Sequence, residues 1–462
     1  MFPPSTNREA DIKNLVEQNT MEIPLVTFQD SDTNVVSHRG SHPDPNPSSN
    51  GTSFHKEDFD TCSVLSRSVS QLEEHEILTS SGISQRVYVQ PSKNKTALVT
   101  YHDIGTNHTS FLGFFNHPEM LVIAKHFTVY HICAPGHHEN APNVVFDDTS
   151  VGMQQNQSLL TDTKENQEQD KPATLTSSGS ISINGRRGSM MEYRFQYPTL
   201  DQLAQMLTSV LVHFGIEYFL GFGMGAGSNI LARYALHNPD NVLGLFLLNP
   251  TATTHTYFQR FRCRWWDLPY LQQGYLTDNL LEQLDSHWFG YGKAENEDVA
   301  QFYHQLARSL NPFNLAGYIQ AFMERTALPL VRPIGPSMPD ATPSVVHESE
   351  PTVIRTDVCL VTGDQAPDLC RALADMNGHM DPRRTQFLTI PDCTGMVMEE
   401  NPDKLAVDFL HFLRTIGLLI NLTPEKLHQQ ATALQVAQHQ SNGLSSSVVG
   451  STLTQLDVGS EL

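Results

Sequence analysis

The chain has 462 residues, of which 39% are hydrophobic and 17% are charged, and its 29 Lys and Arg against 50 Asp and Glu leave a formal net charge of -21. Such an acidic chain repels phosphate backbones, which excludes nucleic acid as its main partner. Six scattered cysteines without a CxxC pair, an N-terminus unlike a secretion signal and the lack of a long apolar run predict a cytoplasmic protein with no transmembrane segment.

Two polar segments are expected to be disordered. Residues 1–71 are rich in Ser, Asn, Asp and Pro, and they cannot bury enough apolar surface to offset the entropy of the chain. Residues 147–191 have a similar composition and are expected to form a disordered insertion in a folded domain. We therefore expect order to begin at residue 72.

Short β-branched and aromatic runs, bounded by Gly, Pro, Asn or Ser, predict the strands of one sheet. They lie at residues 74–78, 84–89, 97–101, 127–133, 218–222, 242–248, 357–362 and 386–390. A helix is predicted from Thr199, because Thr199 and Gln202 have the spacing of a capping box. Further helices at residues 228–237 and 403–416 complete an alternation that predicts a mostly parallel sheet with helices on both faces.

A helical excursion interrupts this alternation. Residues 251–328 contain aromatic helical segments without a strong strand, and we expect them to form a cap. The first part of the core is then 72–250, and a linker at 329–355 leads to its second part at 356–420. A flexible C-terminal tail is predicted at 421–462, with one helix beginning at Thr423 and Pro424.

The glycine-rich turn after the strand at 218–222 is the motif that decides function. A serine hydrolase has G-x-S-x-G here, with the serine on a strained turn between strand and helix. This chain has Gly221, Gly223 and Gly225 in that pattern, and no G-x-S-x-G occurs elsewhere in it. The sequence predicts an α/β-hydrolase fold in which Gly223 stands at the position of the nucleophile.

The other two members of a catalytic triad are also missing at their expected positions. The acid usually follows the strand after the cap in a pattern like G-x-x-D, where this chain has Ala366. The histidine usually lies about seven residues before an E-N-P segment, where this chain has Gly395. Loss of the nucleophile alone costs roughly a millionfold in turnover, so we predict that the chain is not an enzyme.

Polar residues near this turn leave one other chemistry open. His102 and Asp103 follow the strand at 97–101, where hydrolases place an oxyanion-hole backbone, and Phe222 and Met224 are further candidates for lining the crevice. The pair either serves as acid and base in a hydrolase of altered chemistry, which is the alternative function, or hydrogen-bonds to the neighbouring loops.

Two patterns that resemble ligand sites are interpreted as structural. The glycines after residue 222 resemble a dinucleotide fingerprint, but the next strand ends in Asn249 and not in an acidic residue. His137, His138 and Glu139 are adjacent and have no distant Cys or His partners, so a solvated loop is the better interpretation. We predict neither a metal nor a cofactor.

Two surface features are candidates for regulation and binding. Ser189 follows Arg186 and Arg187 in the inserted segment and is either a basophilic kinase site or next to a chance basic pair. The aromatic side chains of the cap form either its own core or, with Arg262 and Arg264, a surface for a partner. They are Phe258, Phe261, Trp265, Trp266 and Trp288.

Six motifs in a fixed order together resemble the N-myc downstream-regulated (NDRG) family. They are TYHDIGTN at 100–107, APG at 134–136, QYPTLDQLA at 196–204, GFGMGAGSNIL at 221–231, ARYALHNP at 232–239 and VTGDQAP at 361–367. The resemblance implies an α/β-hydrolase fold with a lost triad. It also implies a role in cytoplasmic signalling, stress response, differentiation or trafficking, through protein partners or a small ligand in the crevice. Cys133 departs from the family, which usually has Asp before APG.

Overall fold

A single eight-stranded sheet organises the part of the chain that the computed structural model describes, which is residues 72–144, 197–254, 268–290, 297–333 and 352–436. The strand order is β1-β2-β4-β3-β5-β6-β7-β8. Strand β1 (Glu73–Leu78) pairs antiparallel with β2 (Ser84–Gln90), and β2 pairs antiparallel with β4. All other neighbours in the sheet are parallel.

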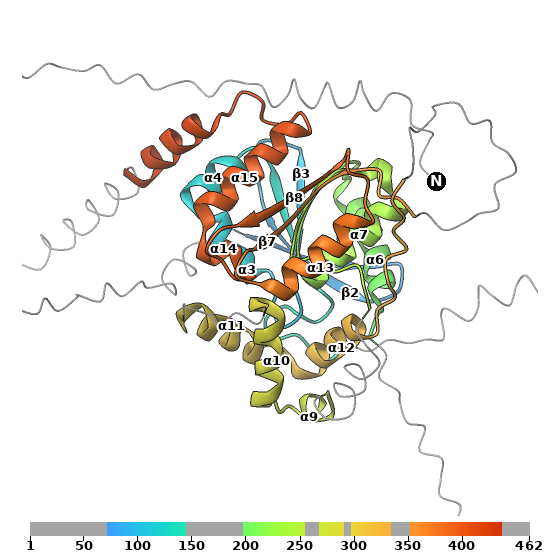
Figure 1. Ribbon diagram of the computed structural model, residues 1–462. Helices are drawn as coiled ribbons and strands as arrows, with labels where there is room; N and C mark the ends of the chain where they lie inside the picture. Colours follow the sequence, from blue (N-terminus) through green and yellow to red (C-terminus); the bar gives the residue numbers. More distant parts are fainter. Residues whose placement is uncertain (1–71, 145–196, 255–267, 291–296, 334–351, 437–462) are drawn as a thin grey trace, which may run out of the picture.

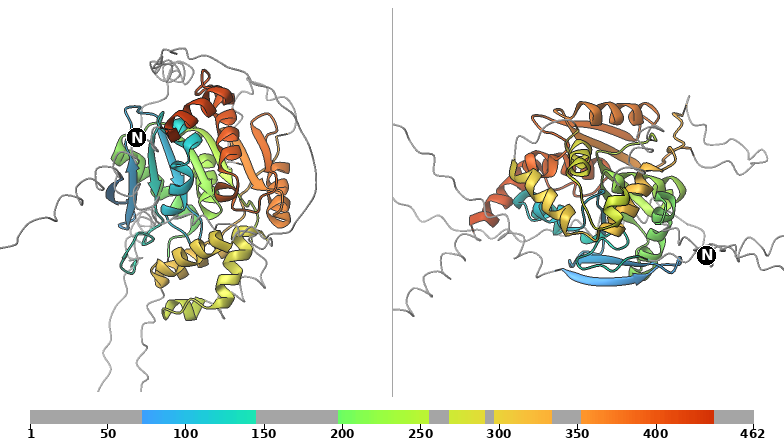
Figure 2. Two further views of the ribbon diagram at one scale, coloured as in Figure 1. Left: turned by 90° about the vertical axis from the view of Figure 1, so that its left-hand side faces the viewer. Right: turned by 90° about the horizontal axis from the view of Figure 1, so that it is seen from below.

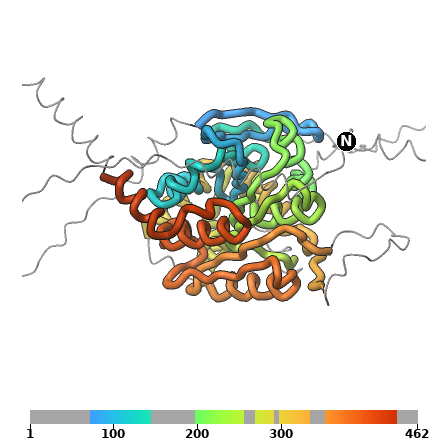
Figure 3. Tube along the Cα trace, turned by 90° about the horizontal axis from the view of Figure 1, so that it is seen from above, coloured from blue at the N-terminus to red at the C-terminus, as the bar shows by residue number. Residues whose placement is uncertain are grey.

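The strands confirm the predicted mostly parallel sheet, and each predicted end lies within two residues of the observed one. Two of them, β3 (Ala97–Tyr101) and β6 (Val242–Leu248), begin and end where the sequence predicts. The remaining strands are β4 (Thr128–Ile132), β5 (Phe219–Met224), β7 (Asp357–Gly363) and β8 (Thr385–Ile390). In Figure 3 the antiparallel strands β1 and β2 form one edge of the molecule and the segment of β8 forms the opposite side.

Helices cover both faces of the sheet (Figures 1 and 3). One face carries α6 (Leu200–Phe214), α7 (Ala226–His237) and α13 (Pro367–Gly378). The other face carries α3 (Thr109–Phe115), α4 (Pro118–Ala124), α14 (Val397–Glu400) and α15 (Pro402–Thr415). Together with the sheet they give the three-layer arrangement that the alternation of strands and helices predicts.

Helix α6 begins at the predicted capping box. The Thr199 hydroxyl accepts from the backbone N–H of Gln202, and the Gln202 side chain accepts from the backbone N–H of Thr199. The helix ends at Gly215, whose φ of 66° lies in the left-handed region that favours glycine. Between these caps Leu203 and Leu207 are buried on one face, as their helical spacing predicts.

An aromatic cluster fills the layer between the sheet and α3 with α15. Phe222 of β5 stacks on Phe246 of β6 with ring centroids 5.4 Å apart, and it meets Phe111 of α3 and Phe409 of α15 edge to face. All four side chains are completely buried. Phe222 is therefore a core residue, and its prediction as a crevice residue is wrong, because alternate side chains of a strand face opposite sides of the sheet.

Helices α9 (Leu268–Gln272), α10 (Asp278–Phe289), α11 (Glu297–Ser309) and α12 (Pro312–Met323) lie between β6 and β7 in the chain. They gather on one end of the sheet, as Figure 2 shows. That end carries the carboxyl termini of the parallel strands, where open α/β sheets bind ligands. These helices stand where the cap is predicted.

Packing continues beyond residue 420. Residues 424–436 are helical, as predicted from Thr423 and Pro424, and Leu427 and Ala431 have no exposed surface. The predicted phosphorylation site Ser189 and the segments 1–71 and 147–191 lie outside the described residues. Within the described residues, every helix is too short or too polar to cross a bilayer.

Candidate functional site

The turn between β5 and α7 corrects the predicted position of the elbow. Strand β5 continues to Met224, so Gly223 lies inside the strand and not at the turn. The residue before α7 is Gly225, with φ 52° and ψ -112°, and a positive φ is the strained geometry that an elbow requires. The apex is therefore Gly225, two residues after the predicted Gly223, and Gly227 takes the place of the second flanking glycine.

Close packing explains the flanking glycines. A Cβ atom on Gly223 would lie 2.7 Å from the Cα atom of Ser228 in α7, and one on Gly227 would overlap the carbonyl oxygen of Tyr101 in β3. Real side chains do not tolerate such contacts. The glycines therefore allow α7 to approach β3 and β5 closely, as in a working elbow.

The carboxylate of Asp103 occupies the position of an oxyanion. Its Oδ1 accepts hydrogen bonds from the backbone N–H of Ile104 at 2.7 Å and of Ala226 at 2.8 Å. In α/β-hydrolases the oxyanion hole consists of the N–H after the nucleophile and an N–H from the loop after the third strand. Ala226 and Ile104 hold these two positions, so a side chain of this chain takes both donors.

Asp103 also fills the space above the elbow. A Cβ atom on Gly225 would overlap the Asp103 carboxyl group, so a larger residue at this apex and the observed Asp103 rotamer exclude each other. We name Asp103, Ile104, Gly225, Ala226 and His287 the elbow site. Of the two alternatives that the sequence leaves open for Asp103, these contacts agree with hydrogen bonding to the neighbouring loops.

The cap closes over the elbow site through α10. His287 Nε2 lies 2.8 Å from Oδ2 and 3.0 Å from Oδ1 of Asp103. The Asp103 side chain is only 2% exposed. The next residue, Trp288, is completely buried and donates from Nε1 to the carbonyl oxygen of Ile104 at 3.0 Å. Trp288 thus belongs to the core under the cap, and His287 is a site residue that the sequence analysis missed.

His102 is held by backbone groups on both ring nitrogens. Its Nε2 accepts from the backbone N–H of Ala134 at 2.9 Å, which leaves the proton on Nδ1, and Nδ1 donates to the carbonyl oxygen of Asp103 at 2.8 Å. Burial, with a smaller contribution from His137, holds the pKa of His102 well below its usual value. His102 is therefore neutral and has no free lone pair with which to act as a base.

The predicted acid and base positions lie against the tip of α10. Ala366 is buried at the start of α13, and a Cβ atom on Gly290 would lie 2.8 Å from the Ala366 Cβ. The backbone N–H of Gly395 donates to the carbonyl oxygen of Phe289 at 3.4 Å, and its carbonyl oxygen accepts from Asn249 Nδ2 at 2.7 Å. The assignment of Ala366 and Gly395 to the lost acid and base stays a prediction.

Two further sequence interpretations need correction. Met224 is buried in the hydrophobic core with 1% exposure, so it does not line an open crevice. His137 is completely buried, whereas the sequence placed it in a solvated loop. Its Nδ1 lies 3.1 Å from the carbonyl oxygen of Pro135, and burial lowers its pKa to about 4. The other cap aromatics and both cap arginines of the predicted partner surface lie outside the described residues.

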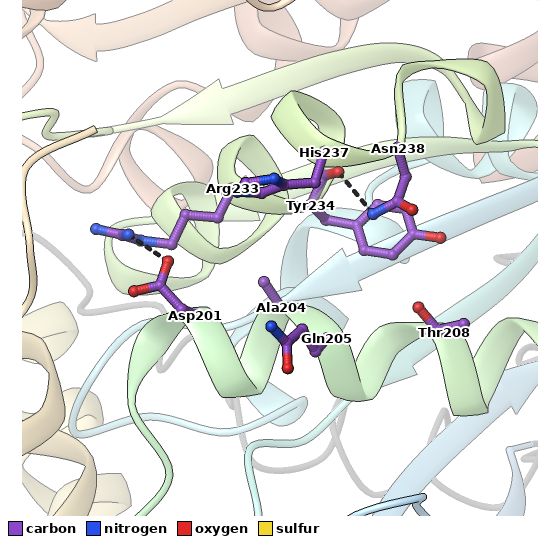
Figure 4. A pocket seen from close by; sticks show the side chains of 8 residues that line it. All are labelled: Asp201, Ala204, Gln205, Thr208, Arg233, Tyr234, His237 and Asn238. Carbon is purple, nitrogen blue, oxygen red and sulfur yellow. Dashed lines mark hydrogen bonds and ion pairs between the residues drawn. The ribbon is translucent and has the colours of Figure 1, made fainter. Parts of the chain in front are cut away.

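A separate pocket of about 290 Å³ lies between α6 and α7 (Figure 4). The charged groups in it are paired with each other, since Arg233 contacts Asp201 at 2.5 Å and also donates to Thr326. Its lining residues are Asp201, Ala204, Gln205, Thr208, Arg233, Tyr234, His237 and Asn238. The pocket has no residue in common with the elbow site.

Sequence comparisons with known proteins agree on one family. A model of the Ndr family matches residues 74–162 and 186–420. The chain is 31% identical to Protein NDRG3 of Xenopus laevis over 388 residues, 82% of each chain, and 30% identical to Protein NDRG4 of Xenopus tropicalis over 400 residues, 86% of this chain and 81% of that one.

Solved structures show the fold. An esterase from Thermogutta terrifontis with malate bound aligns with a TM-score of 0.50 and 14% identity over 75% of this chain and 99% of the esterase. A hydrolase from Pseudomonas aeruginosa PA01 aligns with a TM-score of 0.50 and 15% identity over 74% of this chain and 98% of the other. Identities this low establish the α/β-hydrolase fold alone.

Proposed function

Because the chain belongs to the Ndr family, we propose that it works without catalysis, by binding protein partners or a small ligand. From the family resemblance we further propose that this role lies in cytoplasmic signalling, stress response, differentiation or trafficking. Exposed aromatic side chains on the cap support a protein partner, since Tyr270 is 54% and Tyr275 is 67% exposed and tyrosine is enriched at protein interfaces.

The position of the Asp103 carboxylate carries the proposal. Acyl transfer requires a free oxyanion hole to stabilise the charge that develops on the substrate carbonyl oxygen. Here Asp103 takes both donors, and the apex residue Gly225 has no side chain with which to attack. A substrate would therefore find neither a nucleophile nor the electrostatic stabilisation that usually remains after the nucleophile is lost.

A hydrolase of altered chemistry that uses His102 and Asp103 finds no support in these contacts. General-base catalysis requires a lone pair within hydrogen-bond reach of the substrate proton. The single unprotonated nitrogen of His102 accepts from a backbone N–H, and Asp103 is shared between two backbone donors and His287. These groups stabilise the loop after β3 instead.

We expect the full-length chain to remain unlabelled by a fluorophosphonate probe and to leave a panel of short acyl esters unhydrolysed. Labelling is read by fluorescence after denaturing electrophoresis, with an active serine esterase as the positive control. Label that survives denaturation and maps to a core peptide would contradict the proposal.

The variant Gly225→Ser tests whether the lack of a nucleophile or the closure of the elbow site by Asp103 prevents labelling. We expect this variant to remain unlabelled too, because its Cβ would overlap Asp103 and His102 has no free lone pair with which to activate the hydroxyl. The double variant Gly225→Ser, Asp103→Gly removes that overlap and serves as the matched comparison. Labelling of the single variant would mean that the elbow site opens readily.

We propose Ser189 as a phosphorylation site, on the strength of the preceding Arg186 and Arg187. Phosphorylation would add about two negative charges to a chain of net charge -21, so it would favour basic partners. A phosphopeptide map after activation of basophilic kinases is expected to contain this site, and Ser189→Ala to lack it. If Ser189 remains unmodified after kinase activation, the proposal is wrong.

A further inference from the structure

Four side chains with metal-binding atoms converge where α4, α15 and the helix at 424–436 pack together. His117 precedes α4, Glu119 lies in its first turn, and Asp403 lies in the first turn of α15. His428 extends from the C-terminal helix. Figure 1 shows α4 and α15 side by side, and the two helices are in contact. The four residues therefore come from three distant parts of the sequence.

The atoms lie in pairs at distances close to those between two ligands of one ion. His117 Nδ1 lies 3.2 Å from Glu119 Oε2, His428 Nδ1 lies 3.5 Å from Glu119 Oε1, and His117 Nε2 lies 3.7 Å from Asp403 Oδ1. Ligand atoms around a tetrahedral zinc ion, each about 2.0–2.2 Å from it, are about 3.4 Å apart. One ligand atom each from His117, Glu119 and Asp403 can be chosen so that all three lie within 4.8 Å of one another.

Burial of Glu119 gives independent support. Its side chain is only 8% exposed, and Oε2 has no hydrogen-bond partner among the described residues. Among the described residues, Glu119 forms ion pairs with His117 and His428 and with no lysine or arginine. A buried carboxylate is costly unless a cation or several donors compensate it.

We propose that His117, Glu119 and Asp403 bind a divalent transition-metal ion of the zinc type, with His428 as a fourth ligand. Imidazole and carboxylate donors suit Zn²⁺ and Co²⁺, whereas Mg²⁺ and Ca²⁺ prefer oxygen ligands alone. The two nitrogens of His117 face different carboxylates, so the ring must rotate to present one of them. The Asp403 and His428 side chains are 71% and 78% exposed and are free to adjust.

Such an ion would connect the C-terminal helix to the body of the protein. His428 would then be held to Glu119 of α4 by coordination instead of by an ion pair. Its function would be structural, because all four residues lie on α4, α15 and the C-terminal helix and none belongs to the elbow site. The sequence predicts no metal, because the members of this cluster come from three distant parts of the chain and form no local pattern of ligands.

Co²⁺ titration of the full-length chain, after removal of metals with a chelator, tests the proposal. We expect one tight equivalent, with visible d–d bands, no thiolate charge-transfer band, and displacement by Zn²⁺. In Glu119→Gln and His117→Gln this equivalent should bind at least about 100-fold more weakly, since loss of even an outer-shell partner costs up to about that much. The exposed variant Asp403→Asn serves as a ligand variant that leaves the core intact.

His379→Gln is the matched control, because His379 is exposed and its side chain bonds, among the described residues, to the carbonyl oxygen of Asp375 in the preceding helix α13. It should bind Co²⁺ like the wild type. Equal binding by all variants, a thiolate band in the spectrum, or no tight equivalent would overturn the proposal. The last of these outcomes would mean that the histidines merely form ion pairs with Glu119.

Discussion

Replacing Asp103 by alanine is expected to lower the free energy of unfolding by about 3–5 kcal/mol, the usual cost of removing one partner of a buried charged network. The backbone N–H groups of Ile104 and Ala226 would lose their acceptor inside the protein, and His287 would lose its partner on the cap. Chemical denaturation followed by tryptophan fluorescence and circular dichroism measures the change.

Asp103→Asn is the matched control. Its side-chain oxygen still accepts from both backbone N–H groups, and its amide can donate to the other tautomer of His287, so the loss should be about 1 kcal/mol. Amide hydrogen exchange at Ile104 and Ala226 should accelerate in Asp103→Ala and remain slow in Asp103→Asn. If Asp103→Ala and Asp103→Asn have equal stability, the hydrogen bonds that the side chain of residue 103 accepts do not stabilise the elbow site.

Acidification is expected to unfold the protein at a midpoint between about pH 4 and 5. Four histidines of the described residues are buried, and burial lowers their pKa values: to about 3 for His108 and His131, to about 4 for His137, and well below the usual value for His102. The unfolded chain protonates these imidazoles below about pH 6.5. It then binds more protons than the folded state, so stability decreases as the pH falls.

The size of the effect follows from the number of groups. Each such histidine removes about 1.4 kcal/mol per pH unit below about pH 6.5. Glu399 acts in the opposite direction, because burial raises its pKa to about 8, and it offsets roughly one histidine between about pH 8 and 4.5. A slope of about 4 kcal/mol per pH unit would exhaust a typical stability of about 5–15 kcal/mol within a few pH units.

The slope of unfolding free energy against pH, from denaturant titrations between pH 4.5 and 7.5, checks this prediction. In His131→Gln the slope should decrease by about 1.4 kcal/mol per pH unit, whatever the change in absolute stability. A pH-independent wild type would contradict the assignment of neutral, buried imidazoles.

The elbow shows what a sequence pattern can and cannot determine. Glycines recur at every second position from 221 to 227, so two overlapping frames match the motif equally well. The structure selects the second frame because β5 pairs with β6 as far as Met224, which places Gly225 at the turn. The sheet, the helices on both faces and the loss of the nucleophile are nonetheless predictable, since either frame has glycine at its centre.

Other parts of the site depend on contacts across long distances in the chain. The His287 side chain meets Asp103, 184 residues away, and no local pattern reports that pairing. Helix α13 was not predicted, although Pro367 at its start and the spacing of Leu369, Leu373 and Met376 are signals that a helix leaves in a sequence. The site could thus be located from the sequence, but its closure could not.

The Asp103 carboxylate has the charge and shape of the acid that ester hydrolysis releases. A hydrolase releases such an acid into solution. The Asp103 carboxylate, in contrast, is covalently attached to the protein and stays at the site. A tethered group has an effective concentration on the order of millimolar or more, and it makes the same two hydrogen bonds as a free carboxylate would. Any external acid must therefore compete with the Asp103 side chain for the backbone N–H groups of Ile104 and Ala226.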